Sequence, residues 1–421
     1  MSAYISDDIR SSRFRCNSEA DGHSPDEKER AGIVHRKLLR QPWHICPRAS
    51  RAKDWFFIMQ ARIVSKLSEK ADFSERIVNG FRRAIHEALQ YVGRTAPNPP
   101  VGCAILDEQG NILTVAAHHQ AGALHAEALA LQQCKALGVW DKICDVIVTL
   151  EPCNHTGRTP PCSEALLKTP AKRIWIGVKD PNPYVAGAGH IRLHEGGKEV
   201  ILLDEQSSEI AQYWHQQCVD LLAPFTKFML EQKSWITVKQ AMNMAGSMVP
   251  PKGQKTFTSQ KSLTLAHQLR RGTEAIITGV NTIKMDIPSF TVRHVPDHPD
   301  VTRLLVICSQ AKEKLEDALS EHYIKQAKTN GFSLLLCNDL ERLPELLYAH
   351  KVMWAMVEAG PVLLQEFRQR QLWDEWLTIR QQAQGEDDVN IISKHSASPT
   401  RQLLSDAHFH IEKEDLCSLV S

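Results

Sequence analysis

The sequence lacks a long apolar run, an excess of charge of either sign, and any internal repeat or low-complexity tract. The strongest apolar run near its N-terminus, Trp55 to Met59, is far too short to span a bilayer or to form the core of a signal peptide. Lysine plus arginine (50) nearly balance aspartate plus glutamate (49), so no global field would attract nucleic acid or an anionic membrane. We therefore expect a cytoplasmic protein with no membrane and no nucleic acid among its partners.

The eleven cysteines lack the regular spacing of a disulfide framework, and their number is odd. Several lie inside apolar, strand-like runs, as Cys103, Cys308 and Cys337 do. A cysteine in such a run usually behaves as a small buried hydrophobe. This pattern predicts a reducing compartment, with only Cys153 and Cys162 serving as ligands.

The length of 421 residues allows two or three domains, and 43% hydrophobic with 24% charged residues is typical of a globular protein. Residues 1–74 show no clear hydrophobic period, so we expect a poorly ordered extension there. Arginines near its start would suit an organelle transit peptide, but the acidic residues among them argue against one.

Two α/β domains are predicted, over residues 75–222 and 223–421, with the Ala223-Pro224 dipeptide as the hinge between them. The first has a helix over 75–93, a hairpin, and further strands and helices in alternation; its strands are expected at 101–106, 112–117, 146–150 and 173–178, and two helices begin at Ala126 and Cys162. Strands of the second are expected at 236–241, 275–278, 303–308, 333–336 and 352–357. Such alternation predicts sheets covered by helices.

Four residues of the first domain match a catalytic zinc site. His125 lies directly before a predicted helix, Glu127 follows it by two positions, and Cys153 and Cys162 each follow a proline. One imidazole and two thiolates leave the fourth position of a tetrahedral zinc ion open for water, whose pKa the ion lowers toward neutrality. Glu127 could then carry a proton from this water to a leaving amine. The pattern is typical of the zinc deaminases of bases and nucleotides, although eight residues rather than two separate the cysteines.

Further motifs surround these residues: Ala-Pro-Asn-Pro-Pro-Val-Gly-Cys at 96–103, the segment 118–122, the cysteine-containing run 151–162, and the loop 180–189. Together they resemble the bifunctional riboflavin-biosynthesis deaminase/reductase family. The resemblance implies a cytidine-deaminase-like three-layer α/β/α domain followed by a dihydrofolate-reductase-like α/β domain. It also implies one zinc ion, NADPH, and a diaminohydroxy-phosphoribosylamino-pyrimidine that is first deaminated and then reduced from ribosyl to ribityl. We expect a homo-oligomer as well.

The resemblance assigns roles to five further residues of the first domain. It implies that Asn98 and His118 line the pyrimidine pocket, that Arg158 contacts the substrate, and that Asp180 and Asn182 lie on the ribose-phosphate side. For His118 and Arg158 the sequence leaves an alternative open, because both could be solvated loop residues.

In the second domain the resemblance implies a cofactor site and a substrate site. The residues that would face NADPH are Ala241, Thr282, Asp286, Ser309 and Gly360. Those that would face the substrate are Lys239, Arg270, Phe290, Arg293 and Glu358. Two arginines suit a phosphate, because their forked donors bind its oxygens bidentately.

Three positions depart from the family pattern. Ala245 and Ile287 stand where the family has carboxylates, and Thr256 stands where it has a tryptophan; the segment 380–385 also differs. The missing contacts could weaken cofactor binding, so a second interpretation is a deaminase whose reductase-like domain is weak or inactive. A third is a non-catalytic binding module with a structural zinc. A polynucleotide deaminase is disfavoured by the balanced charge and by the second domain.

Overall fold

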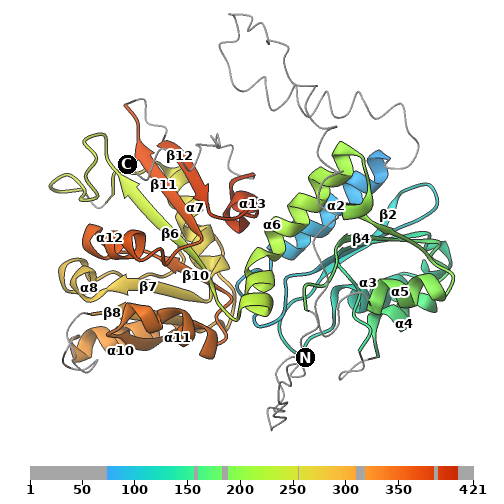
Figure 1. Ribbon diagram of the computed structural model, residues 1–421, viewed down its shortest axis with the longest axis horizontal. Coiled ribbons are helices and arrows are strands. Elements are labelled where there is room, and N and C mark those ends of the chain that lie inside the picture. Colours follow the sequence, from blue (N-terminus) through green and yellow to red (C-terminus); the bar gives the residue numbers. More distant parts are fainter. Residues whose placement is uncertain are drawn as a thin grey trace, which may run out of the picture. The chain divides into compact units, whose positions relative to one another are not determined.

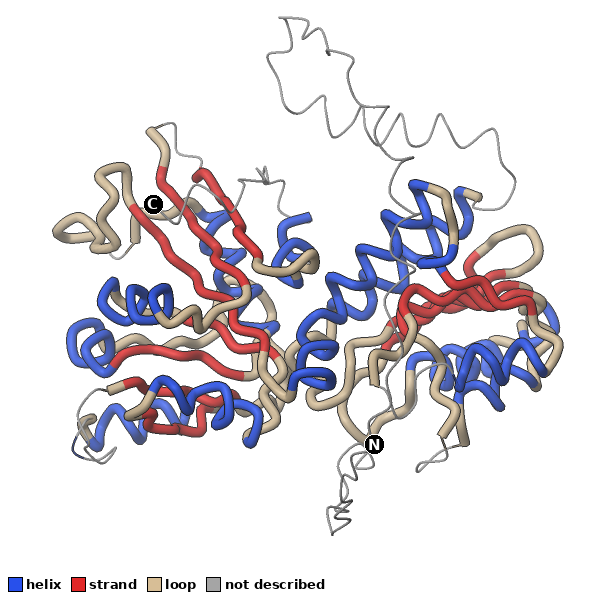
Figure 2. The backbone as a smooth tube through the Cα atoms, in the orientation of Figure 1, coloured by secondary structure: helices blue, strands red, loops and turns tan. Residues whose placement is uncertain are grey.

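The computed structural model describes residues 74–155, 160–182, 188–254, 256–309, 317, 319–383 and 387–405. These residues form a five-stranded and a seven-stranded sheet, both with helices packed against them (Figures 1 and 2). The extension predicted over residues 1–74 lies outside these ranges except for Ser74. Among the helices described, none has both the length and the apolar character that crossing a bilayer requires.

The first sheet has the strand order β2-β1-β3-β4-β5. Strands β1 (Gly102–Leu106) and β2 (Ile112–Ala117) form the predicted antiparallel hairpin, and β1 also pairs antiparallel with β3 (Asp145–Leu150). Strands β4 (Arg173–Val178) and β5 (Glu199–Leu202) continue the sheet in parallel. The carboxyl ends of β3 and β4 therefore share one edge, which is where parallel sheets bind ligands.

Helices cover both faces of this sheet, so the predicted three-layer α/β/α arrangement is confirmed. On one face, α2 (Glu75–Leu89) and α6 (Glu209–Glu231) pack against Ile147 of β3. On the other, Val146 and Val148 of the same strand contact the core under α3 (Ala126–Ala136), α4 (Cys162–Leu167) and α5 (Ala188–Glu195). This alternation follows from the two-residue period of a strand. Helix α2 ends before residue 93, where the chain turns through Gly93 at a φ of 85°.

The second sheet has the order β12-β11-β6-β10-β7-β8-β9, and every neighbouring pair is parallel except β11 with β12. Its strands are β6 (Trp235–Met242), β7 (Ala275–Gly279), β8 (Arg303–Cys308), β9 (Phe332–Cys337), β10 (Trp354–Val357), β11 (Glu375–Gln381) and β12 (Asp387–Ser393). The five predicted strands are thus present. The sequence did not reveal β11 or β12. Strand β12 lies at the edge of the sheet and fully buries only Val389.

Helices also cover both faces of the second sheet. Helices α11 (Leu343–Ala349) and α12 (Pro361–Gln369) pack on the face that carries Ala355 and Val357 of β10. The opposite face is covered by α7 (Gln260–Gly272), α8 (Val280–Asp286), α10 (Glu321–Thr329) and α13 (Pro399–Ser405). Short 3-10 turns complete the chain at Trp140–Lys142, Leu203–Glu205 and Leu340–Arg342.

Helix α6 runs through the position at which the domain boundary was predicted. Ala223 and Pro224 are buried inside this continuous helix, so they lie in helix and not in a linker. Beyond them, Phe225 and Phe228 pack with Met353, which directly precedes β10. The limits 75–222 and 223–421 themselves stay a prediction.

Candidate active site

Two helices and one strand of the first domain bring His125, Cys153 and Cys162 together. His125 is the residue before α3, Cys153 follows β3, and Cys162 is the first residue of α4. Nδ1 of His125 lies 3.5 Å from Sγ of Cys153 and 3.3 Å from Sγ of Cys162. The backbone N–H of Cys162 also donates to Sγ of Cys153 at 3.4 Å. Among the described residues, these three form the one cluster able to hold a metal ion, with ligand atoms within 4.8 Å of one another.

This cluster fits zinc. With bonds of about 2.0 Å to nitrogen and about 2.3 Å to sulfur, a tetrahedral ion requires nitrogen–sulfur separations of about 3.5 Å. The observed separations of 3.3 and 3.5 Å come close to that value. The hydrogen bond from Cys162, together with the neighbouring His125, lowers the pKa of Cys153 to about 4, so one thiolate ligand is favoured at neutral pH. The predicted zinc site is therefore confirmed as a His/Cys/Cys centre.

Glu127 lies in the first turn of α3, beside the metal cluster. Its side chain is only 3% exposed. Burial raises the pKa of Glu127 to about 7, and a hydrogen bond with Cys162 opposes that shift. A carboxyl group with a pKa near neutrality can both accept and return a proton, which is what general acid/base chemistry requires.

Asn98 and His118 form a buried pair next to this centre. His118 is therefore not a solvated loop residue. Nδ1 of His118 lies 3.0 Å from the carbonyl oxygen of Leu124, so it carries a proton and donates. Burial lowers the pKa of His118 to about 4, which leaves Nε2 as an acceptor. The amide nitrogen of Asn98 donates to that Nε2 at 3.0 Å. The Oδ1 atom of Asn98 is buried as well, and it has no hydrogen-bond partner among the residues that the structure describes.

The segment from Asp180 to His190 is attached to the metal loop through Glu151, which the sequence reasoning did not single out. The Glu151 carboxylate accepts the backbone N–H groups of Asp180 and Gly189 at 3.1 Å each, and that of His190 at 2.9 Å. The approach is so close that a Cβ on Gly189 would lie 1.9 Å from the carbonyl oxygen of Pro152. Only the Glu-Pro-Cys order in the sequence could have pointed to this contact.

Of the other residues predicted for this region, the structure describes Asp180 and Asn182. Asp180 and Asn182 are both buried, and the N–H of Asn182 donates to the Asp180 carboxylate at 2.9 Å. Arg158 lies outside the described residues.

In the second sheet, charged residues meet at the carboxyl ends of β6 and β10, next to the point where the chain order reverses between β10 and β7. Such a switch point is the usual ligand site of an α/β sheet. The Glu358 carboxylate accepts Lys239 Nζ at 3.0 Å and is bound bidentately by Arg270, at 2.9 and 2.8 Å. Burial alone would raise the pKa of Glu358, but Arg270 and Lys239 outweigh it and hold this pKa far below its usual range.

A second polar group lies close by, on the segment that follows α8. The guanidinium of Arg293 donates to the hydroxyls of Ser289 and Thr291, and its backbone N–H donates to Nδ1 of His267 at 2.9 Å. Phe290 is buried beneath, with its ring centroid 5.9 Å from the Arg270 guanidinium carbon. His267 was missed by the sequence reasoning, because a lone histidine within a helix carries no pattern.

The predicted cofactor residues lie around the same edge. Thr282 Oγ1 accepts the backbone N–H of Gly360 at 3.2 Å, which joins α8 to the start of α12. Ala241 and Ser309 are half-buried, at the ends of β6 and β8, and Asp286 is exposed at the end of α8. The role of these last three residues stays a prediction.

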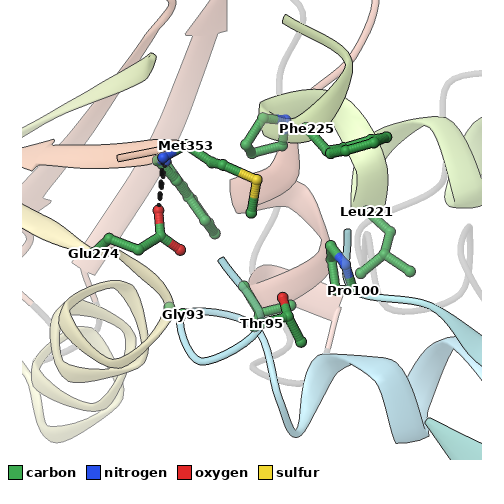
Figure 3. A pocket seen from close by; sticks show the side chains of 11 residues that line it. Gly93, Thr95, Pro100, Leu221, Phe225, Glu274 and Met353 are labelled. Atoms are coloured by element: carbon green, nitrogen blue, oxygen red, sulfur yellow. Dashed lines mark hydrogen bonds between the residues drawn. The ribbon is translucent and has the colours of Figure 1, made fainter. Parts of the chain in front are cut away.

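A small, partly open pocket lies apart from both sites. It lies between the turn at Gly93 to Pro100, helix α6 and the start of β10 (Figure 3). Glu274 reaches into it while accepting the N–H groups of Met353 at 3.0 Å and Trp354 at 2.7 Å. Its volume of about 20 Å³ is enough for a water molecule but too small for a substrate.

Comparison with known families agrees with both sites. The family model of the cytidine and deoxycytidylate deaminase zinc-binding region matches residues 76–178, and that of the RibD C-terminal domain matches residues 234–380. The predicted fold class, a cytidine-deaminase-like domain followed by a dihydrofolate-reductase-like domain, is thereby confirmed. The two matches also confirm the predicted cofactor classes, zinc in the first half and, through the reductase domain, NADPH in the second.

Individual relatives match most of the chain. The riboflavin biosynthesis protein RibD of Aquifex aeolicus is 33% identical over 321 residues, which are 70% of this chain and 84% of that protein. That of Actinobacillus pleuropneumoniae is 32% identical over 310 residues, 67% of this chain and 77% of that protein. The structure of Acinetobacter baumannii RibD is 26% identical, covers 82% of this chain and 94% of its own, and gives a TM-score of 0.61. The chain therefore belongs to the RibD family of riboflavin biosynthesis proteins, which join a zinc deaminase to a reductase.

Proposed function

We propose that this chain carries out two successive steps on one phosphorylated pyrimidine. The first is the hydrolytic deamination of a diaminohydroxy-phosphoribosylamino-pyrimidine to 5-amino-6-(5-phosphoribosylamino)uracil. The second is the NADPH-dependent reduction of the ribosyl group to ribityl. The observation that carries the first step is the convergence of His125, Cys153 and Cys162 beside the buried carboxyl of Glu127.

The residues of the first site divide the work of deamination. Zinc held by the three ligands supplies a water of lowered pKa. Glu127 takes a proton from this water and passes it to the leaving amino group, which departs as ammonia. Asn98 supports this assignment, because its buried Oδ1 needs a donor and a ring amino or imino group of the pyrimidine offers one. Asp180 and Asn182 we assign to the ribose-phosphate side, where Glu151 keeps their segment against the metal loop.

The deaminase step is tested by Glu127→Gln in the full chain. We expect ammonia release to fall by about 10² to 10⁴, the usual contribution of a general acid/base, with one zinc ion still bound. Oxidation of NADPH should continue when the deaminated pyrimidine is supplied. Unchanged ammonia release from the zinc-loaded variant would refute the role of Glu127, and it would favour a zinc that serves structure alone.

For the reductase step, the contacts of Arg270 and Arg293 support different roles for the two arginines. All the contacts of Arg270 are internal, because its donors reach Glu358 and the carbonyl oxygen of Thr291. Arg293 is exposed and lies with two hydroxyls, Ser289 and Thr291, which together suit a phosphate group. We therefore assign the substrate phosphate to Arg293, and to Lys239, Arg270, Phe290 and Glu358 the walls of the substrate site.

NADPH, when bound, supplies the hydride for this step. We assign its site to Ala241, Thr282, Asp286, Ser309 and the turn at Gly360, on the basis of their place at the carboxyl edge of the second sheet. The test is to supply the deaminated pyrimidine with NADPH and follow the loss of NADPH absorbance. A folded protein that releases ammonia but never oxidises NADPH would refute the reductase half alone.

We further propose a cytoplasmic homo-oligomer. All eight cysteines described are free, as a reducing compartment would keep them. Several apolar side chains of the second domain are exposed, and such groups favour association. They are Met244 and Val249 after β6, Met285 and Ile287 at the end of α8, and Val362 in α12. Sedimentation of the full chain at micromolar concentration tests the oligomer; a single monomeric species would refute it.

A further inference from the structure

Two cysteines of the second sheet lie directly opposite each other on neighbouring strands. Cys308 ends β8 and Cys337 ends β9, and the parallel register of this pair places the two residues side by side. Both belong to the same core, so their side chains lie on one face of the sheet, under α11 and α12. Both thiols are free.

This placement satisfies the distance requirement of a disulfide. Neighbouring strands lie roughly 4.8 Å apart, and disulfides join Cα atoms separated by about 4.4 to 6.8 Å. Strand β9 is the outermost strand of the described sheet, so it can adjust toward β8 without disturbing a further strand. A bridge between directly paired residues of flat neighbouring strands is strained, and strained disulfides are the readily reduced ones.

The Cys337 thiol also has a polar neighbour on the backbone. The Cys337 thiol contacts the carbonyl oxygen of Asp339 at 3.2 Å. Hydrogen bonding from Cys308 lowers the pKa of Cys337 to about 7, which favours a reactive thiolate there. Both residues are buried, at 7% and 2% exposure, so a small oxidant reaches them more readily than a bulky disulfide does.

We propose that Cys308 and Cys337 are a redox modification site, at which a peroxide forms a reversible disulfide across the edge of the second sheet. The Cys337 thiolate attacks one peroxide oxygen and breaks the oxygen–oxygen bond, which gives a sulfenic acid and hydroxide. The Cys308 thiol then attacks the Cys337 sulfur, the sulfur–sulfur bond forms, and water leaves. Two thiols lose two electrons in total, and one hydrogen peroxide is reduced to two waters.

The site has a consequence for the proposed reductase, on which this part of the inference rests. Ser309, which we assign to the cofactor site, directly follows Cys308, and its backbone N–H donates to the carbonyl oxygen of Cys337 at 3.0 Å. A bridge that draws the strand ends together therefore shifts Ser309. We expect the oxidised protein to lose at least half of its NADPH oxidation rate and to regain it with dithiothreitol.

The test uses the full chain, hydrogen peroxide as the oxidant, and alkylation followed by tryptic peptide mapping. Residues 304–312 and 329–342 are tryptic peptides with one cysteine each. We expect them to appear joined after oxidation, two hydrogens lighter than their sum, and separate after dithiothreitol. Recovery of both peptides singly alkylated, or each with its own sulfinic acid, would overturn the proposal.

Variants separate the pair from the other cysteines. Cys308→Ser and Cys337→Ser should each abolish the joined peptide and keep the rate of NADPH oxidation unchanged after peroxide. The control is Cys144→Ser, at a buried cysteine directly before β3. This variant should still form the joined peptide and still lose NADPH oxidation after peroxide. The wild-type peptide map tests the disulfide even if a variant folds poorly. The NADPH rate of the reduced wild type is measured first, so an inactive reductase is distinguished from a failed switch. A joined peptide with an unchanged rate would overturn the regulatory part.

Discussion

The buried carboxyl of Glu375 should make the second domain less stable as the pH rises. Glu375 begins β11 and is fully buried, where its oxygens accept the indole N–H of Trp235 and the hydroxyl of Ser398, each at 2.9 Å. Burial raises its pKa from 4.5 to about 7, and no cation pairs with it in the described contacts. The folded state therefore prefers the protonated form.

The sign and size of the effect follow from this shift. A group whose pKa is raised on folding contributes stability that is present below its unfolded pKa and is lost as the pH rises through its folded pKa. One pKa unit is worth about 1.4 kcal/mol, so a shift from 4.5 to about 7 corresponds to about 3 kcal/mol lost between pH 4.5 and 7. In Glu375→Gln the amide keeps an acceptor for Trp235 and a donor for Ser398 but cannot ionise, so this loss should disappear.

The assay is urea unfolding of the full chain at several pH values from 5 to 8, followed by tryptophan fluorescence. As the pH rises across this range, the free energy of unfolding of Glu375→Gln should increase relative to that of the wild type by about 3 kcal/mol. The exposed residue Glu345 on α11 gives the matched control, because Glu345→Gln should follow the wild type. Equal pH slopes for wild type and Glu375→Gln would refute the reasoning, as would a variant destabilised equally at every pH.

Three further outcomes are expected. Ile287→Asn should raise the free energy of unfolding by about 1 kcal/mol in a urea titration, because Ile287 is β-branched, 64% exposed and held at a φ of 44°. Glu358→Gln should lower the free energy of unfolding by about 3 kcal/mol, because Lys239 and Arg270 would then lie together without their carboxylate. A variant as stable as the wild type would show that water solvates these two cations. Removal of zinc with a chelator should stop ammonia release and leave NADPH oxidation of the deaminated pyrimidine unchanged; a parallel loss of both rates would contradict independent sites.

Local chemistry made the metal centre predictable. The residue types of His125, Glu127, Cys153 and Cys162 define the site almost by themselves, because few other arrangements use one imidazole, two thiolates and a nearby carboxylate. The apolar strands were also predictable, since a strand buried on both faces is apolar throughout. Both signals are carried by short stretches of sequence.

Features that depend on tertiary contacts were not predictable. Glu151 binds backbone groups 29 to 39 residues away, and such a pairing exists only after β3 and β4 have become neighbours. Strand β12 lacks a clear pattern, because it lies at the edge of its sheet and buries only Val389. The buried pairing of Asn98 with His118 fixes a tautomer, which only the position of the Leu124 carbonyl decides.

Two of the predicted departures from the family pattern, Ala245 and Thr256, lie where the side chains contribute little to the fold. Ala245 is exposed in a turn that Asn243 Oδ1 holds by accepting two backbone N–H groups, and Thr256 is exposed as well. By contrast, Lys239, Arg270 and Glu358 bring three charges into a partly buried cluster. A domain that served only to bury surface would be at least as stable with apolar residues in their place. This contrast favours a second domain that keeps its substrate site over one that serves only to bury surface.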